Sequence, residues 1–535
     1  CKASQCSPSE LFKALRPIFP RRKFHSGPSP LPRLRVGAGH FLTEPDAIAE
    51  AWRAHFAKQE AGRTSNPDEL LAQHWLRHRS PTQFSPAACD VFSIAELERL
   101  FVRTRPGRAA GTDGIPPDLL HSFAPEMAAL YHGVVLKMVL HIDEPILWRG
   151  GELIRLYKGK GDTEVCGNFR SILLSSTVGK AVHSGLRARH QPAIAQAANP
   201  LTSGGRKGHS VLLPAQAFRS LLRQRHMRGL STAILFIDLQ AAFYTVVREI
   251  AFQRSTTELD LARIVQDLGL PDEAYRDIRD SLVNASALDA AGIVGFDRAL
   301  LDELYTSTWF VSSGSPTLTV TSRGSRPGDA LADFVFYLLF NRTLAHIEAE
   351  LRAAELLLPI PWNGQRTLEG GHADRHLEVG FATWADDTAL ATGTQLPGDV
   401  GAALTHGASM ILDHLRSVGF LPNFGPGKTE AVVDPVGKGA RRVKRRLFGS
   451  VSASLPVLLE HPPSAELRLV PAYKHLGGKL HFSGRLMPEI KHRAALASAA
   501  FKQRRKLVYL NTGVPLERRA LLFASTILSV LEFGA

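Results

Sequence analysis

The sequence predicts a mixed α+β protein, because patterns of buried strands and of helices both occur along it. Residues 233–239 are almost all apolar, which is typical of a strand that is buried on both faces. Residues 379–391 are also mostly apolar around a short polar break, which predicts a strand, a tight turn and a second strand. Long apolar stretches at 119–140 and 331–344 have the length of helices.

The composition is that of a globular protein with an anionic partner. The chain has 535 residues, 44% of them hydrophobic and 21% charged, enough for about two to four domains with sizeable cores. A net charge of +14 favours a polyanionic partner such as nucleic acid, although a basic ribosomal or membrane-surface protein would have the same sign.

Cysteine usage and hydropathy indicate an intracellular protein that is not embedded in a membrane. Four cysteines, Cys1, Cys6, Cys89 and Cys166, show neither metal-ligand spacing nor disulfide density, which fits a reducing compartment. Neither a signal peptide nor an apolar run of about 18 residues is visible in this stretch of sequence. Because the chain begins with Cys, we expect it to be a piece of a longer protein.

The N-terminal region, residues 1–91, is predicted to be a basic, Pro-rich linker with a short helical entry segment. Ser93 and Glu96 form a capping-box pattern before an apolar run, so a compact domain is expected to begin near residue 92.

Two cations follow predicted strands in the next segment. Lys158 comes directly after a strand at 153–157, and Arg170 lies on the next strand or turn. Together they could hold a triphosphate, although two solvated surface cations are the simpler alternative. After a basic helix at 178–197, the Gly-rich loop at 204–208 carries Arg206 and Lys207, which could follow a phosphate backbone.

Three aspartates predict a divalent-metal site. Asp386 and Asp387 are expected at the tip of the hairpin, where two adjacent carboxylates repel each other unless a cation lies between them. A solvated Asp-Asp turn is the alternative. Asp238 ends the buried strand, before a predicted helix start at 240–243, and would be the third ligand. A pair of Mg²⁺ ions held there would activate a 3′ hydroxyl and neutralise a leaving pyrophosphate.

A second Gly-rich turn, at residues 322–329, follows a mainly helical stretch at 250–310. Gly324 and Gly328 would let the backbone approach a base or sugar closely. An ordinary helix N-terminus capped by Asp329 would give the same pattern. A loop is expected at 358–372, before the hairpin.

Two basic segments lie near the C-terminus. The run at 441–446 is either a solvated face or a backbone contact. The last helix is predicted to bury an apolar stripe of Leu486, Ile490, Ala494, Ala497 and Phe501. Its other faces carry cations, among them Lys502, Arg504 and Arg505, which would suit a duplex groove. A solvated helix is the default alternative.

Taken in order, these blocks resemble the reverse transcriptases of non-LTR (LINE-type) retrotransposons. The resemblance covers roughly residues 92–535 and rests on the blocks GTDGIP, LYKGKGD, NFRSILL, GGRKGHS, FIDLQAAF, RGSRPGD, WADD, GFLPNFGPGKTE and YKHLGGKL. It implies a right-hand polymerase with fingers, an antiparallel palm sheet and a helical thumb. The implied boundaries are fingers and the start of the palm at 92–230, palm with insertions at 231–435, and primer grip with a partial thumb at 436–535.

The resemblance also implies roles for single residues. Asp238, Asp386 and Asp387 would be the palm's catalytic metal ligands, and Lys428 a general acid toward pyrophosphate. Phe243 would be a steric gate that rejects a ribose 2′ hydroxyl. The implied dNTP contacts are Lys158, Arg170, Phe243, Gly324 and Gly328, and the primer grip at 473–478 includes Lys474.

The chain departs from the family pattern at several positions. Trp384 replaces the usual Tyr of the acidic turn, Tyr244 replaces an acid that is not a metal ligand, and Pro327 replaces a Gln in the second Gly-rich turn. Pro327 lacks the hydrogen-bond donors of Gln. The long spacing between Asp238 and the acidic turn predicts inserted elements at about 250–310 and 358–378.

The expected function is therefore an RNA-directed DNA polymerase that uses two Mg²⁺ ions, with Mn²⁺ as an alternative. Its implied partners are an RNA template, a DNA primer and dNTPs, without a membrane, and an endonuclease domain is expected elsewhere in the full polyprotein. Cytoplasmic assembly with RNA and action in the nucleus are implied. The alternatives are a catalytically inactive RNA-binding remnant, favoured by Pro327 and Tyr244, and an RNA-dependent RNA polymerase, disfavoured by Phe243.

Overall fold

The computed structural model describes residues 33–533, apart from 38, 78–83, 160, 198–201, 205–207, 255, 271, 284–285, 314, 316, 363–374, 450–452 and 461–463. The chain divides into a main unit, Leu34–Gly484, and a smaller unit that contains Arg485–Ala535. The predicted segment 436–535 is therefore split between the two units, and the boundaries near residues 91, 230 and 435 stay predictions.

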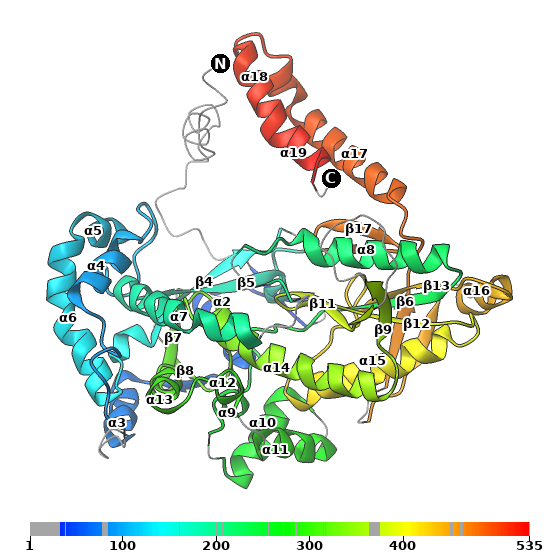
Figure 1. The fold of residues 1–535 in the computed structure, drawn as a ribbon. Helices are drawn as coiled ribbons and strands as arrows, with labels where there is room; N and C mark the ends of the chain where they lie inside the picture. The colour runs from blue at the N-terminus through cyan, green and yellow to red at the C-terminus, as the bar shows by residue number, and fades with distance from the viewer. Residues whose placement is uncertain are drawn as a thin grey trace. The chain divides into compact units, whose positions relative to one another are not determined.

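A six-stranded sheet forms the centre of the main unit, with the order β11-β12-β6-β13-β15-β14 (Figure 1). Its strands are β6 (Ser231–Ile237), β11 (Phe381–Trp384), β12 (Asp387–Thr394), β13 (Glu430–Asp434), β14 (Ser454–Val457) and β15 (Ala465–Leu469). Its neighbours pair antiparallel except β13 and β15, which are parallel. The expectation of an antiparallel sheet thus needs correction, because the fold is α+β with mixed sheets.

Strand β6 is buried along its whole length, as its apolar sequence predicted. Ala233, Leu235 and Ile237 face a core shared with helices α14 (Ala332–Ala353) and α15 (Val400–Ser417). Ile234 and Phe236 face the opposite core, which includes apolar residues of helix α8 (Leu212–Met227). In Figure 1, α8 lies on one side of this sheet and α14 with α15 on the other.

A five-stranded sheet, of order β3-β8-β7-β4-β5, carries the second group of predicted site residues. Its strands are β3 (Arg63–Ser65), β4 (Gly150–Tyr157), β5 (Phe169–Ser175), β7 (Thr308–Ser312) and β8 (Leu318–Thr321). Strands β4 and β7 are parallel, whereas the other pairs are antiparallel. The N-terminal region contributes β3 to this sheet. Its other elements are a separate hairpin of β1 (Leu34–Val36) with β2 (His40–Leu42), and the helices α2 (Pro45–Gln59) and α3 (Pro67–Arg77).

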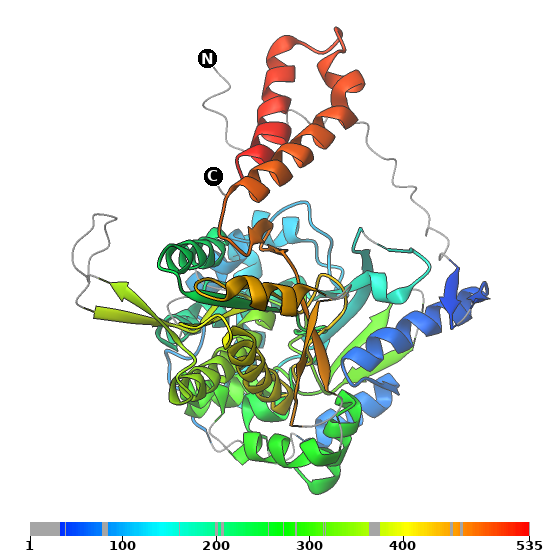
Figure 2. The ribbon, with the colours of Figure 1, turned by 90° about the vertical axis from the view of Figure 1, so that its right-hand side faces the viewer.

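Helices surround both sheets, as Figure 2 shows from a second side. The predicted capping box of Ser93 and Glu96 opens α4 and is confirmed. Four further helices precede α8 and β6 in the described chain: α4 (Ile94–Val102), α5 (Pro117–Ser122), α6 (Ala124–His141) and α7 (Thr177–Ala197). The helical stretch predicted at 250–310 is also confirmed, as α9 (Arg248–Phe252), α10 (Glu258–Leu268), α11 (Tyr275–Val283), α12 (Ala287–Ala290) and α13 (Gly295–Glu303).

Two predicted elements differ from the structure. Residues 240–243 form turns, with Ala241 in the left-handed region at φ 49°, and no helix begins there. The loop expected at 358–372 begins as strand β9 (Leu358–Trp362), which pairs with β10 (Arg375–Val379). Two further elements of the main unit are the hairpin of β16 (Ala472–His475) with β17 (Gly478–His481) and the helix α16 (Ala440–Phe448).

The smaller unit is helical: α17 (Met487–Arg504), α18 (Leu516–Phe523) and α19 (Ser529–Leu531), with π-helical turns at Arg505–Tyr509 and Ala524–Leu528. The predicted apolar stripe is wrong at three of its five positions, because Leu486, Ile490 and Ala494 are exposed. Ala497 is buried and Phe501 is half-buried. Glu489 and Arg493 are buried instead. They pair at 2.7 Å, and the Arg493 guanidinium stacks 4.4 Å from the Phe533 ring, which compensates for the buried charges.

None of the helices in the described ranges combines the length and the apolar character that a membrane crossing requires.

Candidate active site

The acidic turn is the tip of the β11–β12 hairpin. Trp384 pairs with Asp387, which leaves Ala385 and Asp386 as a two-residue loop, and Ala385 takes a left-handed φ of 55°. The predicted strand, tight turn and strand are therefore confirmed. Such a loop keeps both carboxylates at one end of the sheet.

The register of β12 brings Asp238 to the same end. Thr388 pairs with Ile237, so the next residues outward, Asp387 and Asp238, are neighbours across the two strands. The backbone of Asp238 is fixed from the other side, because its carbonyl accepts a hydrogen bond from the Asn423 N–H at 2.8 Å. Asn423 also donates from its side chain to Asp238 Oδ2 at 3.2 Å. Two strands and the loop after α15 thus position this carboxylate.

Burial, together with the charges of neighbouring carboxylates, raises the pKa values of Asp386 and Asp387 at this end of the sheet. Burial among protein atoms and the charges of Asp386 and Asp238 raise the pKa of Asp387 to about 6, although its residue surface at the hairpin tip is exposed. Burial and the Asp238 charge also raise the pKa of Asp386. Three carboxylates that destabilise one another fit a site for a divalent cation, for which carboxylate oxygens are the preferred ligands.

Lys428 supplies positive charge to the group. Its Nζ lies 3.0 Å from Asp238 Oδ1, and its carbonyl accepts a hydrogen bond from the Tyr473 hydroxyl at 2.7 Å. Tyr473 in turn stacks on Phe236, with ring centroids 4.2 Å apart. The loop that carries Lys428 is therefore fixed to β6 and to the β16–β17 hairpin.

Lys158 and Arg170 lie at the paired ends of β4 and β5. Arg170 pairs with Leu156 and is exposed, and Lys158 Nζ donates to the Gly167 carbonyl at 2.7 Å. Burial and the charges of Arg170 and Lys428 lower the pKa of Lys158, and Asp238 opposes this shift. The structure therefore brings these two cations within Coulombic range of the aspartates.

The second Gly-rich turn packs against the Phe243 loop and β5. Ser325 donates from its backbone N–H to the Phe243 carbonyl at 2.7 Å. Gly324 has φ +90°, and a Cβ there would lie 3.1 Å from the Tyr244 carbonyl oxygen. Gly328 has φ +112°, and a Cβ there would lie 2.8 Å from the Leu173 carbonyl oxygen. Both positions require glycine because of the backbone conformation and the close approach.

Phe243 is half-buried and rests on the core. Its ring contacts Phe336 of α14, with centroids 4.5 Å apart. The turn holds its carbonyl, as described above, so both the ring and the backbone of Phe243 are fixed.

Tyr244 joins the Phe243 loop to the strand that carries Arg170. Its hydroxyl donates to the Ser171 carbonyl at 3.0 Å and accepts from Ser171 Oγ at 2.7 Å. Burial raises the pKa of Tyr244, so the hydroxyl stays protonated at neutral pH. Tyr244, which stands where the resemblance leads one to expect an acid, therefore has a structural partner in Ser171.

Tyr244→Phe is expected to lower the free energy of unfolding by about 1 kcal/mol, because the hydroxyl of the buried Ser171 loses its partner. Urea denaturation followed by circular dichroism measures this loss. Ser171→Ala should cost less, because the Tyr244 hydroxyl keeps its hydrogen bond to the Ser171 carbonyl. The double variant should cost little more than Tyr244→Phe, which already removes both hydrogen bonds between the two residues. Fully additive losses would contradict the link.

The predicted phosphate-binding residues Arg206 and Lys207 lie outside the described residues. The segment just before them is placed along β11, because Ser203 donates its N–H to the Thr383 carbonyl at 2.9 Å. A Cβ on Gly204 would lie 2.0 Å from the Ala385 nitrogen, so only glycine fits beside the acidic turn. The Gly-rich loop thus starts directly next to the hairpin.

The remaining predicted nucleic-acid contacts belong to two units. Lys474 is exposed on β16 in the main unit. Lys502 and Arg504 end α17, and Arg505 begins the π-helical turn of the smaller unit, with Lys502 and Arg505 exposed.

Sequence reasoning missed a buried ion network behind the second Gly-rich turn. His183 of α7 lies between two carboxylates, with Nδ1 2.7 Å from Asp329 and Nε2 2.5 Å from Glu144, and all three side chains are almost fully buried. Burial opposes protonation of His183, but the two carboxylates outweigh it and raise its pKa to about 10. The only signal was a histidine in a helix that read as basic.

A second carboxylate group is an ion-pair cluster. Ligand atoms of His74, Asp143 and Glu303 lie within 4.8 Å of one another. The Arg149 guanidinium contacts Asp143 at 2.8 Å and Glu303 at 2.6 Å, so an arginine already supplies the compensating charge. We therefore assign no metal to this group.

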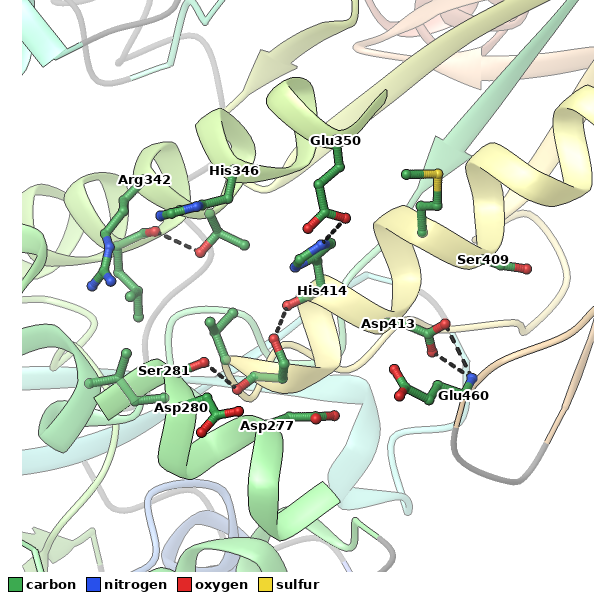
Figure 3. A pocket seen from close by; sticks show the side chains of 16 residues that line it. Asp277, Asp280, Ser281, Arg342, His346, Glu350, Ser409, Asp413, His414 and Glu460 are labelled. Carbon is green, nitrogen blue, oxygen red and sulfur yellow. Dashed lines mark hydrogen bonds and ion pairs between the residues drawn. The ribbon is translucent and has the colours of Figure 1, made fainter. Parts of the chain in front are cut away.

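A cavity of about 430 Å³ opens between α11, α14 and α15 (Figure 3). Asp277 and Asp280 of α11 line it below, and Glu350 of α14 pairs with His414 of α15 at 2.6 Å. None of the sequence-predicted site residues lines it. The cavity is therefore separate from Asp238, Asp386 and Asp387, which lie at one end of the central sheet.

Comparison with known proteins gives one indication of origin. No family model matches the chain. A stretch is 27% identical over 183 residues to an uncharacterized 149 kDa protein of transposon TX1 from Xenopus laevis. The match covers 31% of this chain and 14% of that protein's length. This distant similarity supports an origin in a transposable element.

Proposed function

We propose that the chain is the polymerase segment of a LINE-type retrotransposon protein, an RNA-directed DNA polymerase that copies the element's RNA into DNA. The observation that carries this proposal is the meeting of Asp238, Asp386 and Asp387 at one end of the central sheet. The raised pKa values of Asp386 and Asp387 support a role that requires a cation. The similarity to a transposon protein supports the biological setting.

The donor set fits Mg²⁺, or Mn²⁺ as an alternative, held by the three aspartates. When bound, the ions would activate the primer's 3′ hydroxyl and neutralise charge on the leaving pyrophosphate. Arg170, a planar fork, and Lys158, a point charge, would bind the triphosphate on its way to the aspartates. Lys428, 3.0 Å from Asp238, would donate a proton to pyrophosphate.

The right-hand polymerase architecture belongs to this proposal. The six-stranded sheet would be the palm, the region of β4 and β5 the fingers, and the β16–β17 hairpin with Lys474 the primer grip. The helical unit with Lys502, Arg504 and Arg505 would be the start of the thumb. An RNA template, a DNA primer and dNTPs would be the partners, with assembly on RNA in the cytoplasm and action in the nucleus.

Primer extension on an RNA template tests the function. With Mg²⁺ and dNTPs, the purified chain is expected to extend a DNA primer, and Asp386→Ala is expected to remove this activity. If neither protein extends the primer although both bind the RNA, the chain is instead the inactive RNA-binding remnant of the same fold. Equal extension by Asp386→Ala and wild type would contradict the catalytic role of the turn.

Phe243→Ala is expected to admit ribonucleotides, because removing the ring opens the space that a ribose 2′ hydroxyl would occupy. The ratio of kcat/KM for dCTP to that for CTP should fall at least about tenfold, a change of about 1.4 kcal/mol in discrimination. Phe336→Leu is a control, since it alters the packing below the ring and leaves the gate in place. An unchanged ratio in Phe243→Ala would remove the gate assignment.

A further inference from the structure

Helix α16 presents an outward face made of cations. Its nine residues include Arg441, Arg442, Lys444, Arg445 and Arg446 and no acidic residue. Val443 and Leu447, one turn apart, are buried in the core of the main unit. The apolar side of this short helix is therefore already used for folding, and the cationic side faces solvent.

Two of the cations have partners within the protein. Lys444 Nζ lies 3.5 Å from Asp434 Oδ1 and 5.5 Å from the centre of the Phe482 ring. Arg446 donates to the Gly398 carbonyl at 3.2 Å. The side chains of the other three arginines are exposed and have no hydrogen bond or ion pair to any residue that the structure describes: Arg441, Arg442 and Arg445.

This arrangement opposes the stability of the helix. Arg441 and Arg442 stand in the first turn, where the positive end of the helix dipole disfavours cations. Arg441 and Arg445 are four residues apart, as are Arg442 and Arg446, and like charges at this spacing repel. Neither folding nor helix stability explains these three arginines, so they are available to a partner outside the part of the chain that the structure describes.

The helix lies at the other end of the sheet from the aspartates. Strand β13 leads into α16 from Asp434, which pairs with Thr232, whereas Asp238 ends β6 at the opposite side. Six residues of strand separate these levels, about 20 Å at about 3.3 Å per residue. Substitutions on α16 are therefore expected to leave the candidate metal site intact.

We propose that Arg441, Arg442 and Arg445 bind the phosphate backbone of a nucleic acid, at a contact separate from the aspartate site. The proposal rests on the proposed function for the identity of the polyanion, an RNA–DNA duplex. Guanidinium groups form bidentate hydrogen bonds with phosphates. A run of such groups on one helix face releases counterions when it binds a backbone.

Two other anionic partners fit the surface less well. A membrane-surface helix inserts an apolar face into the lipid interface, but Val443 and Leu447 of α16 are occupied in the protein core. An interface with an acidic protein normally centres on buried aromatic or apolar anchors, and the three free arginines present none. A sequence-independent backbone contact requires only the cations.

The test is the salt dependence of duplex binding by the full 535-residue chain. A labelled RNA–DNA duplex is titrated with wild type and with Arg441→Gln/Arg442→Gln/Arg445→Gln, by fluorescence anisotropy, between about 50 and 200 mM salt. The slope of log affinity against log salt should become shallower by up to about 2.7, because each phosphate that an arginine neutralises contributes about 0.9. Affinity at about 100 mM salt should fall at least about tenfold.

A matched control removes the same charge elsewhere. Arg263, Arg276 and Arg279 are exposed on α10 and α11, and their replacement by Gln should leave the slope close to that of wild type. Arg→Lys at the three α16 positions should keep most of the slope. Circular dichroism and thermal unfolding would verify that the variants are folded.

The outcomes separate this proposal from the proposed function. If wild type binds the duplex with the α16-dependent salt slope but does not extend a primer, only the proposed function is overturned. An unchanged slope in the α16 variant, or an equal loss in the matched control, would overturn the α16 contact. Stronger α16-dependent binding to phosphatidylserine vesicles or to polyglutamate than to the duplex would also overturn it.

Discussion

Asp387→Asn is expected to lower nucleotide incorporation about a thousandfold or more while the protein becomes more stable without metal. Stabilisation of the transition state by metal ions is worth several kcal/mol, and each 1.36 kcal/mol is a factor of about ten in rate. Asparagine keeps the shape of the side chain but loses the charge that would hold the cation. Single-turnover extension with saturating dNTP measures the loss.

The stability gain follows from the raised pKa of Asp387. A carboxyl whose pKa rises from about 3.9 in the unfolded chain to about 6 in the folded protein favours folding at low pH and loses that contribution as pH rises through 6. At pH 7.5 the folded protein therefore carries an unfavourable charge, which asparagine removes. The melting temperature of the metal-free variant should exceed that of wild type at pH 7.5, and the difference should shrink toward pH 5.

Metal titration gives the complementary readout. Because a carboxylate must be ionised to bind a cation, Mg²⁺ should raise the melting temperature of wild type more at pH 7.5 than at pH 5.5. Asp399→Asn, at the start of α15 and outside the acidic turn, is the charge-matched control and should respond as wild type does. If Asp387→Asn were less stable than wild type at pH 7.5, or retained full activity, the turn would not be a metal site.

Sequence patterns were sufficient for the elements that form this site. Strand β6 had to be buried on both faces because Ala233 to Ile237 offer no polar side, and alternate residues indeed face two cores. The hairpin followed from two apolar runs around a polar pair. If both elements are strands of one sheet, Asp238 and Asp387 can lie side by side, because each stands at the end of its strand.

Other features depended on contacts that no local pattern reveals. The parallel pairing of β13 with β15 joins segments that only tertiary packing brings together. The turn at 240–243 has a sequence that predicted a helix start, but the Gly-rich turn holds the Phe243 carbonyl and fixes a non-helical backbone. Asn423 and Thr429, which bond to Asp238, lie 185 and 191 residues away in the sequence. Such partners become visible only in three dimensions.

The second large expected effect is a loss of stability when the buried network of Glu144, His183 and Asp329 is broken. His183→Ala is expected to lower the free energy of unfolding by about 3–5 kcal/mol, the usual result of removing one partner from buried charges. Two buried carboxylates then lose the cation between them, although Arg326 stays 4.0 Å from Asp329. Asp329 also anchors the end of the second Gly-rich turn. His406→Ala, an exposed histidine on α15, should change stability by no more than about 0.5 kcal/mol.

The pH dependence distinguishes this ion network from loss of packing alone. The pKa of His183 is about 6.5 in the unfolded chain and about 10 in the folded protein, so its contribution is complete below pH 6.5 and lost as pH rises through 10. The difference in unfolding free energy between wild type and His183→Ala, from urea denaturation, should therefore be smaller at pH 10 than at pH 6. A difference that stayed constant would mean that His183 stabilises the protein by filling space. A shrinking difference would show that its positive charge holds Asp329, and with it Gly324 and Gly328, in place.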